Sequence, residues 1–390
     1  MFKTKSLLKK IIICIISSIF TLIVSIVSIE IYLRFTLHPY PKVTNSKGTN
    51  RNLGYTAMPG EKGLYKFLDN ENKMRYIPYQ INSLGYRDIE HSITKPKNIK
   101  RIMMFGDSFL AGHQVDFENI LSRQLSKNLE HIYNKKYEIF NFGLIGNQPS
   151  TELLTLENLA LKYSPDYVII CFFQNDPMDL SEKLENGETI KEIWHHILSD
   201  TNELILVKPD IEKKSLRRKI NSFLRENTFI YNWQKEKINN LKNNLRKNHD
   251  LFLKLKSFDK LFLKELPEEI EKNWTLTLKI YEKILQISKE NNFKIIILNI
   301  PSANMFDKQK LKSYINKFEE TKNSEIEPHN AHIRLEKFCR EKNIDYVYPF
   351  EIFSKYKTED LYFINDGHLT EKGHKILAKI LSDKIIELEK

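Results

Sequence analysis

The chain has 390 residues, of which 41% are hydrophobic and 28% are charged. These fractions are typical of globular proteins and exclude a disordered or fibrous chain. The net charge of +11 does not by itself indicate a nucleic-acid partner, because the sequence contains no basic stripe interleaved with aromatic residues.

The N-terminal segment predicts a membrane anchor. Residues 11–29 read IIICIISSIFTLIVSIVSI and carry no charge. As a helix this run would span about 28 Å, close to the hydrocarbon thickness of a bilayer. The lysines that precede it favour a cytoplasmic N-terminus; they are Lys3, Lys5, Lys9 and Lys10.

A cleaved signal peptide is the alternative interpretation, but a small-residue cleavage site should then follow the apolar run. The first alanine of the chain is Ala57. We therefore expect residues 1–37 to form a cytoplasmic tip and a single-pass anchor. Both interpretations place the rest of the chain outside the cytoplasm.

Residues 38–98 are rich in Pro, Gly, Asn and Lys, which indicates a stalk followed by an N-terminal extension. Within it, INSLGYRD at 81–88 mixes apolar and turn residues, so we expect it to pack on the main domain.

The main domain is expected at 99–390 and begins with alternating strands and helices. KRIMMFGDS ends at Ser108 and contains a short apolar run that predicts a buried strand. Two more strands are predicted within 137–144 and 166–173, and helical spacing separates them within 117–133 and 151–163. This alternation predicts an α/β fold with a parallel sheet and helices on both faces.

The alternation breaks at about 180–270, where polar, lysine-rich sequence predicts a helical insertion. It would be either a solvated cap or a lid over the substrate site. Regular elements then return to the C-terminus: helices are predicted within 273–291, 332–343 and 369–389, and strands within 293–302 and 344–350.

The three cysteines have no metal-ligand spacing. Cys14 lies in the apolar run, and we expect Cys171 and Cys339 to be small buried residues, although a disulfide between these two stays open. We expect no metal and no organic cofactor.

Two short motifs carry the residue types needed for nucleophilic catalysis. Gly106-Asp107-Ser108 follows the first strand, where a serine that opens a helix can attack an acyl carbon. A serine hydroxyl needs a neutral imidazole as base and a carboxylate to orient it. Asp366-Gly367-His368, just before the last helix, supplies both.

Two further motifs offer hydrogen-bond donors for an oxyanion. The second strand closes at Asn141-Phe-Gly143-Leu-Ile-Gly146, and a glycine lets backbone N–H groups approach a substrate. Asn175 follows the third strand and carries an uncharged amide donor. Each motif alone also fits an ordinary turn or helix cap, and His374 on the last helix is expected to be structural.

Taken together, the order and placement of the four motifs resemble the SGNH (GDSL-type) hydrolase family over residues 99–390, apart from the insertion. The resemblance implies a flavodoxin-like three-layer α/β/α fold. It also implies Ser108 as nucleophile with Asp366 and His368 as its partners. The implied oxyanion donors are Ser108, Gly146 (with Gly143 in reserve) and Asn175.

Two positions depart from the family pattern. Phe173 stands where the third motif usually has glycine, and Asn365 stands at the usual position of the acid. The resulting Asp-x-His spacing, and the run INSLGYRD, resemble bacterial relatives that modify cell-surface polysaccharides.

We therefore expect a membrane-anchored serine esterase that removes O-acyl groups, O-acetyl above all, from an extracytoplasmic glycan. The alternatives are an O-acetyltransferase acting on such a polymer, a lipase or phospholipase, and a non-catalytic polysaccharide-binding module. The sequence does not determine the oligomeric state.

Overall fold

The computed structural model describes most of the chain. The described ranges are 2–36, 47–48, 53–54, 56–177, 193–208, 257–316, 321 and 323–390, with scattered positions between 220 and 238. The chain divides into two compact units, Met1–Tyr40 with Glu212–Phe252, and Pro41–Ile211 with Leu253–Lys390.

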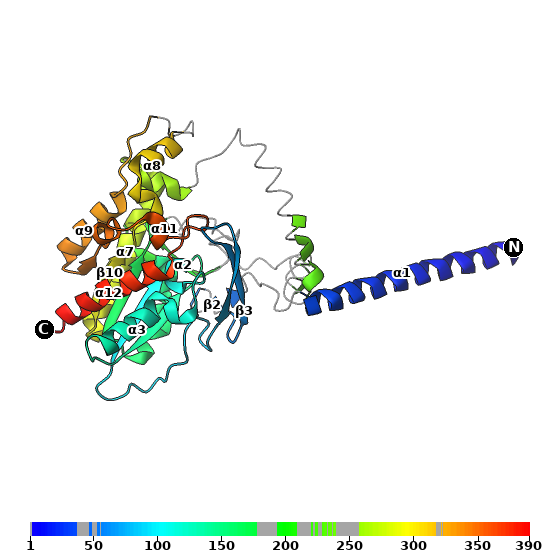
Figure 1. Ribbon diagram of the computed structural model, residues 1–390, viewed down its shortest axis with the longest axis horizontal. Coiled ribbons are helices and arrows are strands. Elements are labelled where there is room, and N and C mark those ends of the chain that lie inside the picture. The colour runs from blue at the N-terminus through cyan, green and yellow to red at the C-terminus, as the bar shows by residue number, and fades with distance from the viewer. Residues whose placement is uncertain are drawn as a thin grey trace. The chain divides into compact units, whose positions relative to one another are not determined.

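The first unit contains helix α1 (Phe2–Thr36), the long blue helix of Figure 1. Within its segment Lys10–Thr36, the 18-residue stretch that is most apolar has a mean hydropathy of 2.8 and contains no buried residue. It is long and apolar enough to cross a membrane, and by length and composition it fits a membrane anchor or a signal sequence.

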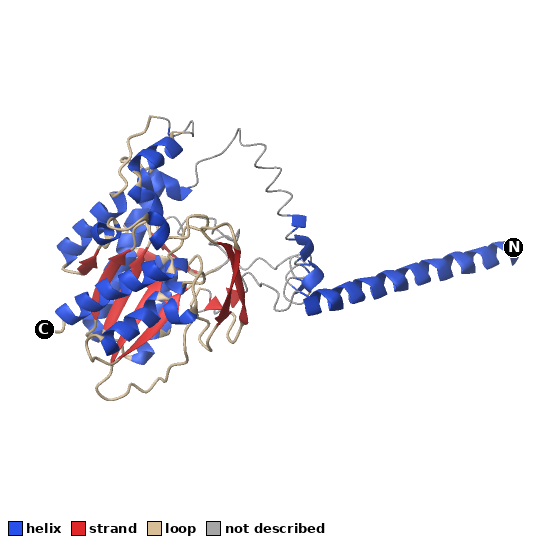
Figure 2. Cartoon of the chain, viewed as in Figure 1, coloured by secondary structure: helices blue, strands red, loops and turns tan. Residues whose placement is uncertain are grey.

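The second unit is built on a five-stranded parallel sheet in the order β11-β10-β7-β5-β6. If these five strands are numbered 1 to 5 along the chain and the sheet is read from β6 to β11, the order is 2-1-3-4-5. This is the order of a flavodoxin-like doubly wound sheet, and it confirms the predicted fold class. Figure 2 shows the strands behind one layer of helices. The strands are β5 (Lys100–Gly106), β6 (Tyr137–Gly143), β7 (Tyr167–Phe172), β10 (Lys294–Asn299) and β11 (Asp345–Val347).

The strands are continuously apolar because helices cover both faces of the sheet. In β5, Ile102 and Met104 face one core, whereas Met103 and Phe105 face the other. One layer consists of α2 (Ser108–Ala111), α3 (Leu121–His131) and α12 (Glu371–Glu387). The opposite layer consists of α4 (Pro149–Asn158), α7 (Glu268–Asn291) and α9 (Asn330–Lys342).

All three cysteines are free. Cys171 is buried in the core beneath α2 and α12, whereas Cys339 is buried in the core beneath α7 and α9. The sheet separates these two cores, so the disulfide left open by the sequence does not form.

The N-terminal extension contains an antiparallel hairpin, β3 (Lys62–Leu68) with β4 (Met74–Gln80). The run INSLGYRD follows this hairpin and packs on the sheet domain, as expected. Asp88 at its end accepts a hydrogen bond of 2.8 Å from the backbone N–H of Asn141 on β6.

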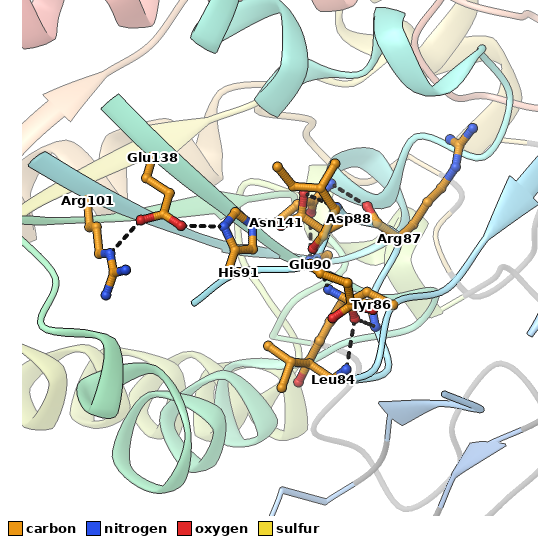
Figure 3. Close-up of polar contacts among 12 residues, drawn as sticks. Leu84, Tyr86, Arg87, Asp88, Glu90, His91, Arg101, Glu138 and Asn141 are labelled. Carbon is orange, nitrogen blue, oxygen red and sulfur yellow. Dashed lines mark hydrogen bonds and ion pairs between the residues drawn. The ribbon is translucent and has the colours of Figure 1, made fainter. Parts of the chain in front are cut away.

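A buried chain of charges continues from this run, and Figure 3 shows it. The ring of His91 lies between Asp88 and Glu138, at 2.9 Å from each carboxylate, and Nε of Arg101 donates to Glu138 at 2.7 Å. Burial lowers the pKa of His91, but the two carboxylates outweigh it and raise that pKa. The extension is therefore held to the sheet by charge-assisted bonds.

The predicted insertion at 180–270 is only partly described. Its described part includes a β-hairpin, β8 (His195–Leu198) with β9 (Leu204–Val207), which the sequence did not predict. Two amphipathic pieces of the insertion were expected to be helical: SLRRKINSFL at 215–224 lies mostly outside the described residues, whereas HDLFLKLKSFDKLFLKEL at 249–266 is described from Ser257 onward. The remaining short elements are β1 (Lys47–Gly48), β2 (Thr56–Ala57), η1 (Phe117–Asn119), η2 (Ala160–Tyr163), η5 (Ser257–Phe262), η6 (Ala303–Phe306), α8 (Lys308–Ile315), α10 (Phe350–Phe353) and α11 (Thr358–Leu361).

Candidate active site

Three neighbouring strands end at the same level of the sheet. Gly106 at the end of β5 is in register with Gly143 on β6 and with Cys171 on β7. The loops that follow these strands therefore emerge together, at the point where the strand order reverses. This carboxyl edge is where open α/β sheets bind ligands.

Ser108 is the first residue of α2. The preceding Asp107 caps this helix, because its Oδ1 accepts a hydrogen bond of 2.9 Å from the N–H of Phe109. Gly112 ends the helix in a left-handed conformation at a φ of 60°. A single short turn between two fixed ends thus holds the serine at the edge of the sheet.

The structure brings Ser108, His368 and Asp366 into one hydrogen-bonded line. Nε2 of His368 lies 2.7 Å from Oγ of Ser108, and its Nδ1 lies 2.6 Å from Oδ1 of Asp366. The histidine and aspartate side chains are 20% and 16% exposed. A carboxylate at Nδ1 favours a proton there and leaves Nε2 as an acceptor for the serine hydroxyl.

A tight turn presents the aspartate and the histidine on the same side. The N–H of Phe363 donates to the carbonyl of His368 at 2.8 Å, and the N–H of Asp366 donates back to Phe363 at 3.0 Å. Gly367 between them has a φ of 92°, a conformation that only glycine adopts without strain. This glycine explains how an Asp-x-His spacing, one residue shorter than the usual pattern, still brings both side chains to the serine.

The two glycines after β6 differ in their surroundings. The N–H of Gly143 already donates to Oδ1 of Asn141 at 2.9 Å, and its Cα lies against α2, where a Cβ would be 2.5 Å from the N of Ala111. Gly146 lies in the following loop at a φ of 66°. The occupied N–H and the close packing of Gly143 argue against this residue as an oxyanion donor.

Asn175 lies in the turn that follows β7. Asp176 closes this turn, since its N–H donates to the carbonyl of Phe173 at 3.0 Å and its buried carboxylate accepts from the N–H of Phe173 at 3.3 Å. The turn carries Asn175 at the same sheet edge as Ser108.

Phe173, which replaces the usual glycine, forms an aromatic wall beside the catalytic histidine candidate. Its ring stacks on Phe109 at 3.8 Å between centroids, and the ring of Phe109 is 4.7 Å from that of His368. The substitution therefore adds apolar bulk next to the hydrogen-bonded line.

Sequence reasoning missed Tyr65, which lies on β3. Burial, and next the charge of Asp366, raise the pKa of its phenol, and its ring stacks on His113 at 5.3 Å. No motif or spacing marks this residue, because the extension is distant in sequence from the residues it adjoins.

Two buried titratable groups lie near the site. Burial, with Arg87 and His368 as neighbouring charges, lowers the pKa of His374 to about 3, so this histidine is a neutral core residue, as expected. Burial, with Asp107 as a neighbouring charge, raises the pKa of Glu152 to about 8. Among the residues that the structure describes, no group of three His, Cys, Asp or Glu side chains is placed to hold a metal ion.

The family model of the GDSL-like lipases and acylhydrolases matches residues 102–381. No curated protein matches the chain in sequence.

Several solved structures are similar to this chain. A psychrotrophic esterase from Pseudoalteromonas sp. is 11% identical, with 74% of this chain and 98% of that chain covered and a TM-score of 0.38. A lipase/acylhydrolase from Enterococcus faecalis is 12% identical, with 74% and 95% covered and a TM-score of 0.38. An acetyl xylan esterase is 12% identical, with 73% and 99% covered and a TM-score of 0.37.

The region matched by the family model begins within β5 and ends within α12. It therefore contains most of the parallel sheet domain, with the serine, the histidine and the aspartate, and it spans well over half of the chain. The chain belongs to the family of GDSL-like lipases and acylhydrolases, and it is a serine hydrolase of the ester-hydrolysing class.

Proposed function

We propose that this enzyme hydrolyses O-acyl esters with Ser108 as nucleophile, His368 as general base and Asp366 as the group that orients the imidazole. One observation carries the proposal: the hydroxyl, the imidazole and the carboxylate are linked by contacts of 2.7 and 2.6 Å. Both distances lie within the range required for proton transfer.

The proposed reaction has two steps. His368 takes the proton of Ser108 as the serine oxygen attacks the ester carbonyl, and the alcohol leaves with that proton. His368 then takes a proton from water, which attacks the acyl-serine. The carboxylic acid is released and Ser108 regains its proton from His368. Backbone N–H groups of Ser108 and Gly146 and the amide of Asn175 are the proposed donors to the oxyanion, and each such donor is typically worth about 3–4 kcal/mol of transition-state stabilisation.

The proposed substrate is an O-acetylated glycan outside the cytoplasm. The stacked rings of Phe109 and Phe173 beside His368 favour a small acyl group, because they occupy space that a longer chain would need. The apolar helix α1 supports a location at a membrane, where surface polymers lie within reach.

The test uses the full-length chain in detergent micelles. We expect hydrolysis of p-nitrophenyl acetate at a higher kcat/KM than p-nitrophenyl octanoate, and covalent labelling by a fluorophosphonate. Ser108→Ala should lose both activities, whereas Ser126→Ala, a change at a partly buried serine on α3, should retain them.

Other outcomes would identify the alternatives. A preference for the octanoate ester would indicate a lipase, and α1 is the feature that makes this the second candidate. Acetyl transfer that accelerates with an added sugar acceptor would indicate a transferase. Identical behaviour of wild type and Ser108→Ala would indicate a binding module.

A further inference from the structure

The tip of the β3–β4 hairpin is hydrogen-bonded to the loop that carries Asp366 and His368. The side-chain amide of Asn70 donates to the carbonyls of Glu359 and Tyr362, each at 2.9 Å. Its Oδ1 accepts from the N–H of Ile364 at 2.6 Å. One side chain thus bonds backbone groups on both sides of Phe363, where the loop begins.

A second set of bonds runs in the opposite direction. The side-chain amide of Asn365 donates to the carbonyl of Asp69 at 2.7 Å and to Oδ1 of Asn72 at 3.1 Å. Asn365 stands at the position that holds the acid in the usual family pattern, and here it binds the hairpin instead. Its neighbour in the chain is Asp366, so these bonds to the hairpin lie directly next to the carboxylate.

The hairpin tip also has hydrogen bonds of its own. Oδ1 of Asp69 accepts from the N–H groups of Glu71 and Lys73 at 2.9 and 2.8 Å. Asn72 takes a left-handed conformation with a φ of 60°, which closes the tight turn. A preformed tip can fix the loop without a large entropic cost of its own.

Apolar contact supports the polar bonds. Phe67, buried at the end of β3, meets the ring of Phe363 edge to face at 4.8 Å. Such aromatic pairs stabilise a contact beyond the burial of their surface alone. The loop is therefore held both at its backbone and at its first side chain.

We propose that Asn70 is a positioning residue, and that the hairpin clamps the Asp366–His368 loop at hydrogen-bonding distance from Ser108. This inference rests on the proposed triad. The hairpin precedes residues 102–381, the region that matches the family, so the hairpin side of the clamp lies outside the matched region, whereas the loop that it holds lies inside it.

The clamp should act on the chemical step and not on substrate binding. In the contacts described above, Asn70 bonds the end of α11 and the start of the loop, not the serine. Its effect would therefore be on the alignment of the histidine ring with the serine oxygen, which must persist through proton transfer. A displacement of about 1 Å in such a group can cost as much as 100-fold in rate. Loss of the clamp should therefore lower kcat and leave KM almost unchanged.

The experiment compares Asn70→Ala with Glu71→Ala in the full-length chain. Glu71 lies at the same tip, with a 71% exposed side chain paired to Lys73, so it controls for changes in the hairpin itself. With p-nitrophenyl acetate, kcat of Asn70→Ala should fall about 10- to 100-fold with KM within about twofold. Fluorophosphonate labelling should slow in parallel, while Glu71→Ala matches wild type.

Hydrogen–deuterium exchange gives a readout that does not depend on catalysis. In Asn70→Ala the amides of residues 362–368 should exchange faster, with exchange in β5 and β7 unchanged. Asn365→Ala removes the opposite arm and should show the same pattern, which keeps the test valid if Asn70→Ala fails to fold. Wild-type kcat and wild-type exchange in both variants would overturn the clamp.

The two proposals fail in different ways. If the wild type hydrolyses no ester and takes no fluorophosphonate, the proposed function is wrong, while the exchange data still report on the clamp. If the wild type is active and the two asparagine variants are unchanged, only the clamp is wrong.

Discussion

Two carboxyl groups, one hydrogen-bonded to His368 and one on α4, have opposite surroundings. Asp366 is partly exposed and hydrogen-bonded to His368, so its charge can orient the imidazole. Glu152 is fully buried on α4, and burial together with the charge of Asp107 raises its pKa to about 8. At neutral pH the second carboxyl therefore stays largely protonated and is unsuited to stabilise an imidazolium.

The raised pKa of Glu152 predicts a pH-dependent stability. The folded-state pKa lies above the ordinary value of 4.5 for a glutamate, so the stability contributed by the protonated form is complete below that value and is lost as pH rises towards 8. Glu152→Gln removes this titration. We compare the unfolding free energy of this variant with that of the wild type. Between pH 5 and pH 9 the difference should shift in favour of the variant by about 2–4 kcal/mol.

Denaturant unfolding of both proteins at a series of pH values measures this difference. A constant difference across the range would show that Glu152 is ionised in the folded protein.

Asp366→Asn tests the orienting role of the carboxylate. An amide can hold the imidazole in the wrong tautomer, so we expect kcat to fall by roughly 1,000- to 10,000-fold with little loss of stability. The matched control is Asp360→Asn, which removes only a surface ion pair with Lys372 at 2.9 Å. Steady-state kinetics on p-nitrophenyl acetate would contradict the role if both variants kept wild-type kcat.

At the scale of elements, the position of α2 depends on its contact with β6. Gly143 lies so close to this helix that a Cβ would be 2.5 Å from the N of Ala111 and 2.8 Å from the carbonyl carbon of Leu110. Backbone atoms cannot rotate away as a flexible side chain can. The absence of a side chain at this position therefore sets how close Ser108 lies to the sheet edge.

Gly143→Ala should push α2 away from β6. We expect a loss of about 1–3 kcal/mol in unfolding free energy, together with a fall in kcat, because the nucleophile moves with the helix. Gly60→Ala is the control: it has open space around it but a φ of 75°, so it should cost only about 1 kcal/mol of backbone strain and leave kcat unchanged. Equal kcat in the two variants would rule out the link between this contact and catalysis.

The β8–β9 hairpin is attached to α4 by one buried pair. Oγ of Ser150 accepts from the N–H of His196 at 2.8 Å and lies 2.8 Å from its Nδ1. Burial, and next the charge of His195, lower the pKa of His196 to about 4. The neutral imidazole can then accept a hydrogen bond from the hydroxyl of Ser150, while the oxygen of that hydroxyl accepts from the backbone N–H of His196.

This pair predicts that acid loosens the hairpin. Because the folded-state pKa of His196 is below the ordinary value of 6.5 for a histidine, the stabilising effect of the neutral ring is complete above that value and is lost as pH falls towards 4. Limited proteolysis within residues 193–208 should therefore speed up on acidification. Ser150→Ala should raise the cleavage rate already at neutral pH, at a cost of about 1–3 kcal/mol for the unpaired buried groups; a cleavage rate independent of both changes would contradict this attachment.

At the scale of the whole molecule, α1 would make the enzyme a membrane-tethered hydrolase. We expect the full-length chain to stay with the membrane pellet after alkaline carbonate extraction, and a variant without residues 2–36 to be released. Mass spectrometry of the cellular protein distinguishes an anchor from a cleaved signal sequence. A mature protein that lacks the apolar run would exclude the anchor.

The sequence alone determined the sheet domain and the chemistry of its edge. The strands are continuously apolar and the helices show helical spacing, so local pattern was sufficient to predict the parallel sheet. Ser108, Asp366 and His368 could be found because they stand at strand ends or before a helix. The β3–β4 and β8–β9 hairpins were missed, because they lie in polar segments that lack the regular alternation of strands and helices.

Only the tertiary structure decided how these residues meet. Ser108 and His368 are 260 residues apart, and nothing local in the sequence fixes the distance between them. The bonds of Asn70 to the residues before Asp366 join segments that are even farther apart in the chain, through backbone carbonyls that any residue would provide. Contacts between a side chain and a distant main chain leave no motif in the sequence, so they appear only when the chain is folded.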